Sequence, residues 1–160
     1  MSEKLNMTAD ERGILAKNYF QNGYNCSQAV SLAFSDVMGI EKDTLLKLSS
    51  SFGGGMGRLR EVCGAVSAMF LVLGYVRGYS APDDFDGKKQ LYAEIQELAA
   101  TFESKYGSIV CRELLNGVSH TDGKVPEKRT EEYYKKRPCG EQIEYAAKIL
   151  HEFLEARGDI

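Results

Sequence analysis

The chain has 160 residues, of which 43% are hydrophobic and 27% are charged. This is the composition of a globular protein, and it excludes intrinsic disorder, collagen and low-complexity fibres. The net charge of −3, with acidic and basic residues interspersed, gives no broad electrostatic footprint for nucleic acid. The length suits one domain over residues 1–160 with a sizeable core.

The chain shows no segment suited to export or to a bilayer. Residues 1–6 lack the apolar stretch of a secretory signal. The longest apolar run, residues 63–76, is interrupted by glycine and serine and is too short to span a membrane. We therefore expect no membrane insertion and a cytoplasmic location.

Apolar residues recur at helical spacing nearly throughout, and no stretch alternates as a strand does. Thr8 and Glu11 have the spacing of a capping box and predict a helix that runs to about residue 21. Asn25 and Gln28 are expected to start a second helix that ends near residue 38. Asp43 is the expected cap of a short third helix that ends near residue 48.

The middle of the chain contains its most apolar helix. A glycine cluster at residues 53–57 precedes residues 61–79, which leave little polar surface and predict a central, buried helix. A turn at residues 81–84 then predicts a long helix to about residue 106. Gly107 is expected to end this helix, and Ser108 to cap a short helix that contains Cys111.

The last part of the chain is a polar segment followed by a helix. Residues 116–138 are charged and lack a strong period, so they predict a long surface loop with one helical turn near residues 131–135. Pro138 is expected to introduce a last helix over residues 139–156. Together these elements predict an all-α, single-domain helical bundle of about six or seven helices.

Four cysteines, Cys26, Cys63, Cys111 and Cys139, are widely separated and form neither a CxxC pair nor a zinc-finger pattern. Each lies near the start of a predicted helix and on its apolar side, where unpaired N–H groups stabilise a thiolate. Nearby basic residues could add to this effect: Arg58, Arg60, Arg112 and the run 135–137. The four thiols could therefore converge at one end of the bundle. Alternatively, the helix starts point in different directions and the cysteines are small apolar core residues.

The glycine-rich segment offers a second candidate site. Residues 51–58 resemble an anion-binding loop, with Gly54, Gly55, Gly57 and Arg58 as the candidate cofactor-binding residues. The segment matches neither the P-loop nor the dinucleotide fingerprint. A tight turn between closely packed helices is the simpler interpretation, although the segment could also line the cysteine site.

The two histidines offer little for catalysis or metal binding. His120 lies in the polar loop, and His151 stands beside Glu152 in the last helix, where a surface position is expected. The basic run 135–137 is offset by nearby glutamates, which favours a solvated charge cluster.

The glycine-rich run 53–58, the sequence Glu-Val-Cys-Gly-Ala-Val at 61–66, and the single cysteines before and after them resemble the C-GCAxxG-C-C family. Its members are small bacterial and archaeal proteins described as redox-active. The resemblance extends over about residues 25–157, with one departure: Ala68 stands where the family's motif ends in glycine. The resemblance implies functional pairing or clustering of the four cysteines and indicates no substrate.

Three hypotheses about function remain open. In the first, the chain is a thiol-based redox protein in which Cys63 and Cys139 react while Cys26 and Cys111 resolve or support them. In the second, the four thiolates hold zinc or an iron–sulfur cluster. In the third, the chain is a non-enzymatic binding or scaffold protein. The sequence leaves open the cysteine pairing, any cofactor, the redox partner or small molecule, and whether the chain forms a homodimer.

Overall fold

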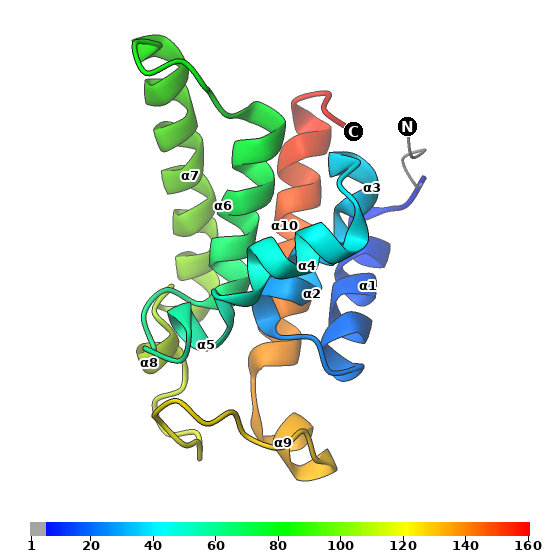
Figure 1. Ribbon diagram of the computed structural model, residues 1–160, viewed down its shortest axis with the longest axis vertical. Helices are drawn as coiled ribbons and strands as arrows, with labels where there is room; N and C mark the ends of the chain where they lie inside the picture. The colour runs from blue at the N-terminus through cyan, green and yellow to red at the C-terminus, as the bar shows by residue number, and fades with distance from the viewer. Residues whose placement is uncertain (1–5) are drawn as a thin grey trace.

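The computed structural model describes residues 6–160, so most of the N-terminal segment discussed above (residues 1–5) lies outside it. Within residues 6–160 the chain forms helices and no β-strand, apart from an isolated antiparallel bridge between Val62 and Val110. The predicted all-α, single-domain bundle is confirmed (Figure 1). No helix in the described part of the chain combines the length and the apolar character needed to cross a membrane.

Six helices in residues 6–160 have eight residues or more, in agreement with the predicted number. They are α1 (Ala9–Gln21), α2 (Cys26–Ala33), α4 (Lys42–Ser50), α6 (Gly64–Arg77), α7 (Phe85–Tyr106) and α10 (Cys139–Ala156). Shorter helical segments connect them: α3 (Ser35–Met38), α5 (Gly53–Met56), α8 (Cys111–Leu114) and α9 (Glu131–Lys136). The helical turn expected within the polar loop is α9.

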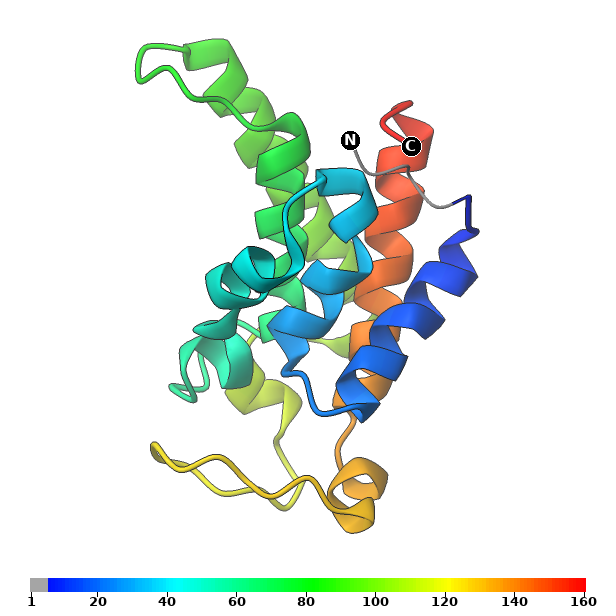
Figure 2. The same cartoon turned by 45° about the vertical axis from the view of Figure 1, so that its right-hand side comes forward.

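The core lies between α6, α2, α10 and α1. Helix α1 packs along α10 and against α2, and α2 and α10 pack on α6. Met69 and Leu73 of α6 are fully buried, which confirms the prediction of a central, buried helix. Leu150 of α10 is also fully buried. Helices α2, α6 and α10 all begin at the end of the bundle where α5, α8 and α9 lie (Figures 1 and 2).

Several helix ends follow directly from the local sequence. The Thr8 hydroxyl accepts a hydrogen bond from the Glu11 N–H at 3.1 Å, and the Glu11 carboxylate accepts one from the Thr8 N–H at 2.9 Å. This capping box and the corresponding one at Asn25 are confirmed. Gly107 ends α7 with a left-handed φ of 83°.

Two expectations about the N-terminal half were wrong. Glu41, and not Asp43, caps α4, because the longer Glu41 side chain accepts hydrogen bonds from the N–H groups of residues 43 and 44. The helix expected to continue to residue 38 is interrupted at Phe34. The Ala33 carbonyl there accepts a hydrogen bond at 2.7 Å from the buried guanidinium of Arg12, which competes with the helical bond.

The central helix and the short helix α8 also begin later than expected. Helix α6 begins at Gly64 because the backbone before it pairs with the segment that precedes α8. The Ser108 hydroxyl does not cap α8 but accepts from the Val110 N–H at 2.9 Å, outside the helix.

Candidate functional site

All four cysteines border one cavity of about 60 Å³. Cys26, Cys111 and Cys139 are the first residues of α2, α8 and α10, and Cys63 immediately precedes α6. Because these helices begin at the same end of the bundle, their first residues meet there. The four thiols therefore converge, as the position of each cysteine at a helix start suggested, and all are free thiols in the structure.

Glycines allow the backbone to approach two of the cysteines closely. A Cβ atom on Gly64 would lie 2.3 Å from the Cys26 sulfur, and one on Gly55 would lie 2.6 Å from the Cys111 Cβ. Gly55 also has a left-handed φ of 72°, which disfavours any other residue. The glycine-rich segment thus packs against the cysteine cluster, and Gly54 borders the cavity itself.

A short extended pairing fixes the positions of Cys63 and Cys111. The Cys63 N–H donates to the Ile109 carbonyl at 2.8 Å, and the Cys111 N–H donates to the Glu61 carbonyl at 2.6 Å. These bonds pair residues 61–63, which precede α6, with residues 109–111, which lead into α8. The two buried cysteines are therefore held on adjacent stretches of backbone.

Burial opposes the ionisation of three of the thiols. It raises the pKa of Cys26, raises that of Cys63 well above its ordinary value, and raises that of Cys139 to about 12. The neighbouring sulfurs of Cys26 and Cys139 raise the pKa of Cys63 further. The expectation that helix starts and basic neighbours lower these pKa values was wrong, because loss of water opposes the charged form more strongly than these groups favour it.

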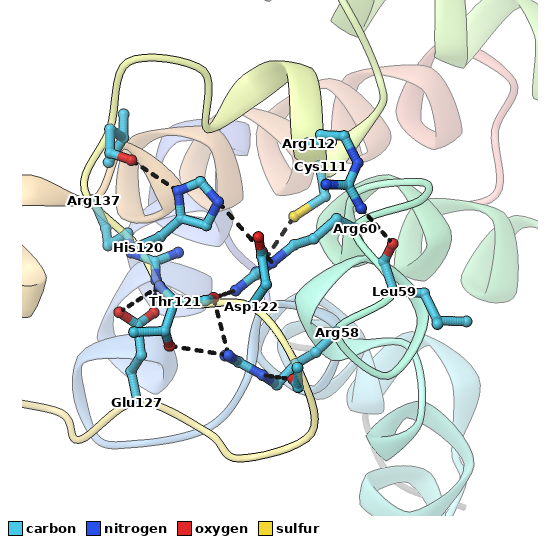
Figure 3. Close-up of polar contacts among 12 residues, drawn as sticks. Arg58, Leu59, Arg60, Cys111, Arg112, His120, Thr121, Asp122, Glu127 and Arg137 are labelled. Carbon is cyan, nitrogen blue, oxygen red and sulfur yellow. Dashed lines mark hydrogen bonds and ion pairs between the residues drawn. The ribbon is translucent and has the colours of Figure 1, made fainter.

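Arg60 contacts a different cysteine from the one expected. Its Nη1 lies 3.7 Å from the Cys111 sulfur, although it precedes Cys63 in sequence. The guanidinium is almost fully buried and also donates to the Thr121 carbonyl at 2.7 Å and to the Asp122 carboxylate at 3.3 Å (Figure 3). Arg60 therefore joins the cysteine cluster to the polar segment.

Arg137 and Arg129 also line the cysteine cavity. Arg137 pairs with the Glu127 carboxylate, and its charge lowers the pKa of Cys139 against the larger effect of burial. Arg129 donates to the Phe20 and Tyr24 carbonyls at 3.2 and 3.3 Å. Arg129 was not among the sequence-based candidates, because it lies in a segment without periodicity and these two carbonyls are more than a hundred positions away in sequence.

The polar loop is present as predicted, but it also covers the cysteine end of the bundle. The Arg58 guanidinium donates to the Gly123 and Thr121 carbonyls at 2.7 and 3.0 Å (Figure 3). Arg58 and Gly57 border a second cavity beside the cysteines, whereas Gly55 packs against Cys111. Of the four candidate cofactor-binding residues, three therefore lie on cavity walls.

The remaining basic and histidine candidates lie elsewhere. Arg112 is exposed and donates to the Leu59 carbonyl at 3.4 Å, and Lys136 pairs with Glu132. The expected surface position of His151 was wrong: its side chain is 3% exposed, and its Nδ1 accepts from the Arg12 Nε at 3.3 Å. Arg12 of α1, which contacts His151, also pairs with Asp36 of α3. The local sequence around residue 151 does not predict either neighbour.

The arrangement of side chains does not itself form a metal site. Across residues 6–160, no group of three or more His, Cys, Asp or Glu side chains is placed so that it could hold a metal ion. Binding of zinc or a cluster by the four cysteines thus stays a prediction.

Comparison with known proteins identifies the family. Residues 24–153 match the family model described as "Putative redox-active protein (C_GCAxxG_C_C)". No curated protein and no solved structure matches the chain. Because the family match covers most of the chain, including all four cysteines and the glycine-rich segment, the protein belongs to the C_GCAxxG_C_C family.

Proposed function

We propose that the four cysteines form a dithiol–disulfide redox centre. The observation that carries this proposal is that all four border a single small cavity, although three of them begin separate helices and the fourth immediately precedes another. The redox-active description of the family supports it. Thiols used only as apolar core residues have no need to gather at one point.

The two half-buried cysteines, Cys26 and Cys139, are the ones that exchange with an external disulfide. Cys63 and Cys111 are 7% and 9% exposed and lie deeper in the site. This assignment replaces the sequence-based preference for Cys63 as an attacking thiol. We assign the attack to Cys139, whose thiolate the positive charges of Arg137 and Arg129 favour against the larger, opposing effect of burial.

The reaction is thiol–disulfide exchange with a disulfide supplied by a partner molecule. The Cys139 thiol loses its proton and attacks one sulfur; the partner's S–S bond breaks, and the leaving sulfur takes up a proton. The Cys26 thiolate then attacks Cys139 in the mixed disulfide, forms the Cys26–Cys139 bond and releases the second partner thiol. Two protein thiols are thus oxidised while one disulfide is reduced to two thiols.

A second candidate, a metal or iron–sulfur centre held by the four thiolates, is favoured by the charges around the cavity. Three guanidinium groups, those of Arg60, Arg129 and Arg137, line the same cavity as the sulfurs. Four thiolates around a divalent metal carry a net negative charge, which buried arginines would stabilise. As the side chains lie, they form no such ligand set, so this candidate requires them to rearrange.

The two candidates are separated by mass spectrometry of protein purified without oxygen. Treatment with a small disulfide, followed by alkylation and peptide mapping, is expected to give a Cys26–Cys139 bridge in the metal-free protein. Cys139→Ser is expected to abolish the mixed disulfide, whereas Cys26→Ser is expected to trap it, and Cys63→Ser is the matched control. Stoichiometric zinc or iron in the native protein would favour the second candidate. Four unreacted thiols without metal would overturn both.

A further inference from the structure

A second cavity of about 310 Å³ adjoins the cysteine cavity. The two share much of their walls, namely Asn25, Gly54, Arg60, Arg129, Tyr133 and Arg137. The larger cavity, which we call the vestibule, is also bordered by the exposed residues Ser50 and Lys124. A molecule that reaches the thiols from this side therefore passes through the vestibule.

The vestibule concentrates positive charge on a protein whose net charge is −3. One carboxylate, that of Glu127, borders it, against five cationic side chains: Arg58, Arg60, Lys124, Arg129 and Arg137. Arg60 pairs with Asp122 and Arg137 pairs with Glu127, which leaves three cations in excess. Such a cavity raises the local concentration of anions.

Two of these guanidinium groups donate only to uncharged oxygens. Arg58 donates to the Gly123 and Thr121 carbonyls and to the Thr121 hydroxyl. Arg129 donates to the Phe20 and Tyr24 carbonyls and to the Tyr134 hydroxyl. Within residues 6–160, neither guanidinium forms an ion pair with a carboxylate. The hydrogen bonds hold both groups in place without neutralising their charge.

We propose that the vestibule binds the carboxylates of a small anionic disulfide and presents its sulfur to Cys139 and Cys26. The reaction of the bound disulfide with the thiols rests on the proposed function, whereas the binding of its carboxylates does not. The volume falls at the lower end of that of small-molecule sites, and guanidinium groups match the geometry of carboxylates. The substrate class is therefore a carboxylate-bearing disulfide of low molecular weight.

A series of three small disulfides tests the charge preference. Dithiodipropionate is doubly negative, bis(hydroxyethyl) disulfide is neutral and cystamine is doubly positive at neutral pH. At low ionic strength the reduced protein is expected to react with the anion about ten-fold faster or more than with the cation, after correction for their rates with free cysteine. The ratio is expected to shrink as salt is added, because salt screens the cavity's field.

Charge variants locate the preference in the vestibule. Arg58→Gln and Lys124→Gln are each expected to lower the anion-to-cation ratio several-fold, whereas Arg58→Lys, which keeps the positive charge but not the guanidinium geometry, is expected to retain part of it. Lys124 is exposed, and among residues 6–160 its side chain forms no hydrogen bond whose loss could unfold the loop. Lys89→Gln is the matched control, since Lys89 is exposed in the first turns of α7, at the opposite end of the molecule from α9 (Figure 1).

Binding without chemistry separates the two proposals. Thiodipropionate has the same carboxylates on a thioether that cannot exchange, and its binding is measured by isothermal titration calorimetry. One possible result is that thiodipropionate binds, and binds more weakly to Lys124→Gln, while none of the three disulfides reacts with the protein. This result would overturn the proposed function and leave the assignment of the vestibule as an anion site standing. Equal corrected rates for all three disulfides, together with no binding of thiodipropionate, would overturn the assignment even where disulfide exchange occurs.

Discussion

The Nη1 of Arg60 lies 3.7 Å from the sulfur of Cys111, so a buried guanidinium from the backbone just after the glycine-rich segment contacts a thiol at the start of α8. The same guanidinium donates to the Thr121 carbonyl at 2.7 Å. One side chain therefore connects the cysteine cluster to the segment that covers it. Loss of this connection is therefore expected to expose the cluster while leaving the contacts of the bundle core in place.

Replacement of Arg60 by glutamine is expected to loosen the cover over Cys111. Alkylation of Cys111 by iodoacetamide should become several-fold faster, and amide hydrogen exchange should accelerate in residues 119–124, because local opening controls both rates. Peptide mass spectrometry measures both. Arg112→Gln is the control: this exposed arginine follows Cys111 in sequence, and within residues 6–160 its guanidinium donates to the Leu59 carbonyl, at 3.4 Å, and to no other group. Equal effects of the two variants would contradict the role of Arg60.

The redox potential of the Cys26–Cys139 pair is expected to depend on pH, because both thiols stay protonated at neutral pH. Burial raises the pKa of Cys26 above its ordinary value of 9.0 and that of Cys139 to about 12. Oxidation of this pair therefore releases two protons with two electrons. The midpoint potential is expected to fall by about 59 mV per pH unit between about pH 6 and pH 8, as measured against glutathione buffers.

A thiolate stabilised by its surroundings would give a different slope. If one thiol of the pair were already ionised at neutral pH, only one proton would be released and the slope would be about 30 mV per unit. Cys63→Ser is the control, since it leaves the Cys26–Cys139 pair in place. The slope therefore shows which effect on the thiol pKa values is larger: the increase caused by burial or the decrease caused by the neighbouring arginines.

The helices, and the position of each cysteine near a helix start, could be predicted because their signals are local. The Thr8 capping box, the left-handed Gly107 and the apolar face of α6 each depend on residues within a few positions. The convergence of the thiols was one of two open alternatives, because the direction in which each helix start points depends on how the helices pack.

The surroundings of the thiols could not be predicted, because contacts distant in sequence create them. Arg129 reaches the Phe20 carbonyl across 109 positions, and Arg60 reaches Cys111 across 51. The raised thiol pKa values have the same origin. The local sequence contains the helix N–H groups that lower a thiol pKa, but not the packing that removes water and raises it.

His151 is expected to make the fold less stable in mild acid. Burial and the charge of Arg12 lower its pKa below the ordinary value of 6.5, so the unfolded chain binds a proton more readily than the folded chain. The stability that the neutral ring contributes is complete above about pH 6.5 and is lost as the pH falls through the folded-state pKa. The wild-type Tm should fall between about pH 7 and pH 5.

The variant His151→Asn tests this dependence. Its amide oxygen can replace Nδ1 as the acceptor for the Arg12 Nε, which lies 3.3 Å away, but the side chain does not titrate. The loss of Tm on acidification should be smaller than in the wild type. His120→Asn, in the polar loop, is the control. An unchanged pH profile in His151→Asn would assign the acid sensitivity to other groups.

Two glycines of the same helix provide the sharpest test of the packing at the cysteine site. A Cβ on Gly64 would lie 2.3 Å from the Cys26 sulfur and 2.9 Å from the Phe52 carbonyl oxygen, whereas one on Gly74 would meet no heavy atom within 4 Å. Gly64→Ala is expected to lower the free energy of unfolding by about 1–3 kcal/mol. Gly74→Ala is expected to raise it by about 0.5–1 kcal/mol, because alanine favours the helix.

Urea unfolding of the reduced proteins measures both changes, and alkylation of Cys26 adds a local readout. The Phe52 oxygen belongs to the backbone and cannot rotate away, so the new methyl group must displace either the Cys26 sulfur or the glycine-rich segment. Either movement should change the alkylation rate of Cys26 in Gly64→Ala and leave it unchanged in Gly74→Ala. A Gly64→Ala protein with wild-type stability and wild-type Cys26 reactivity would mean that the start of α6 and the sulfur do not pack this closely.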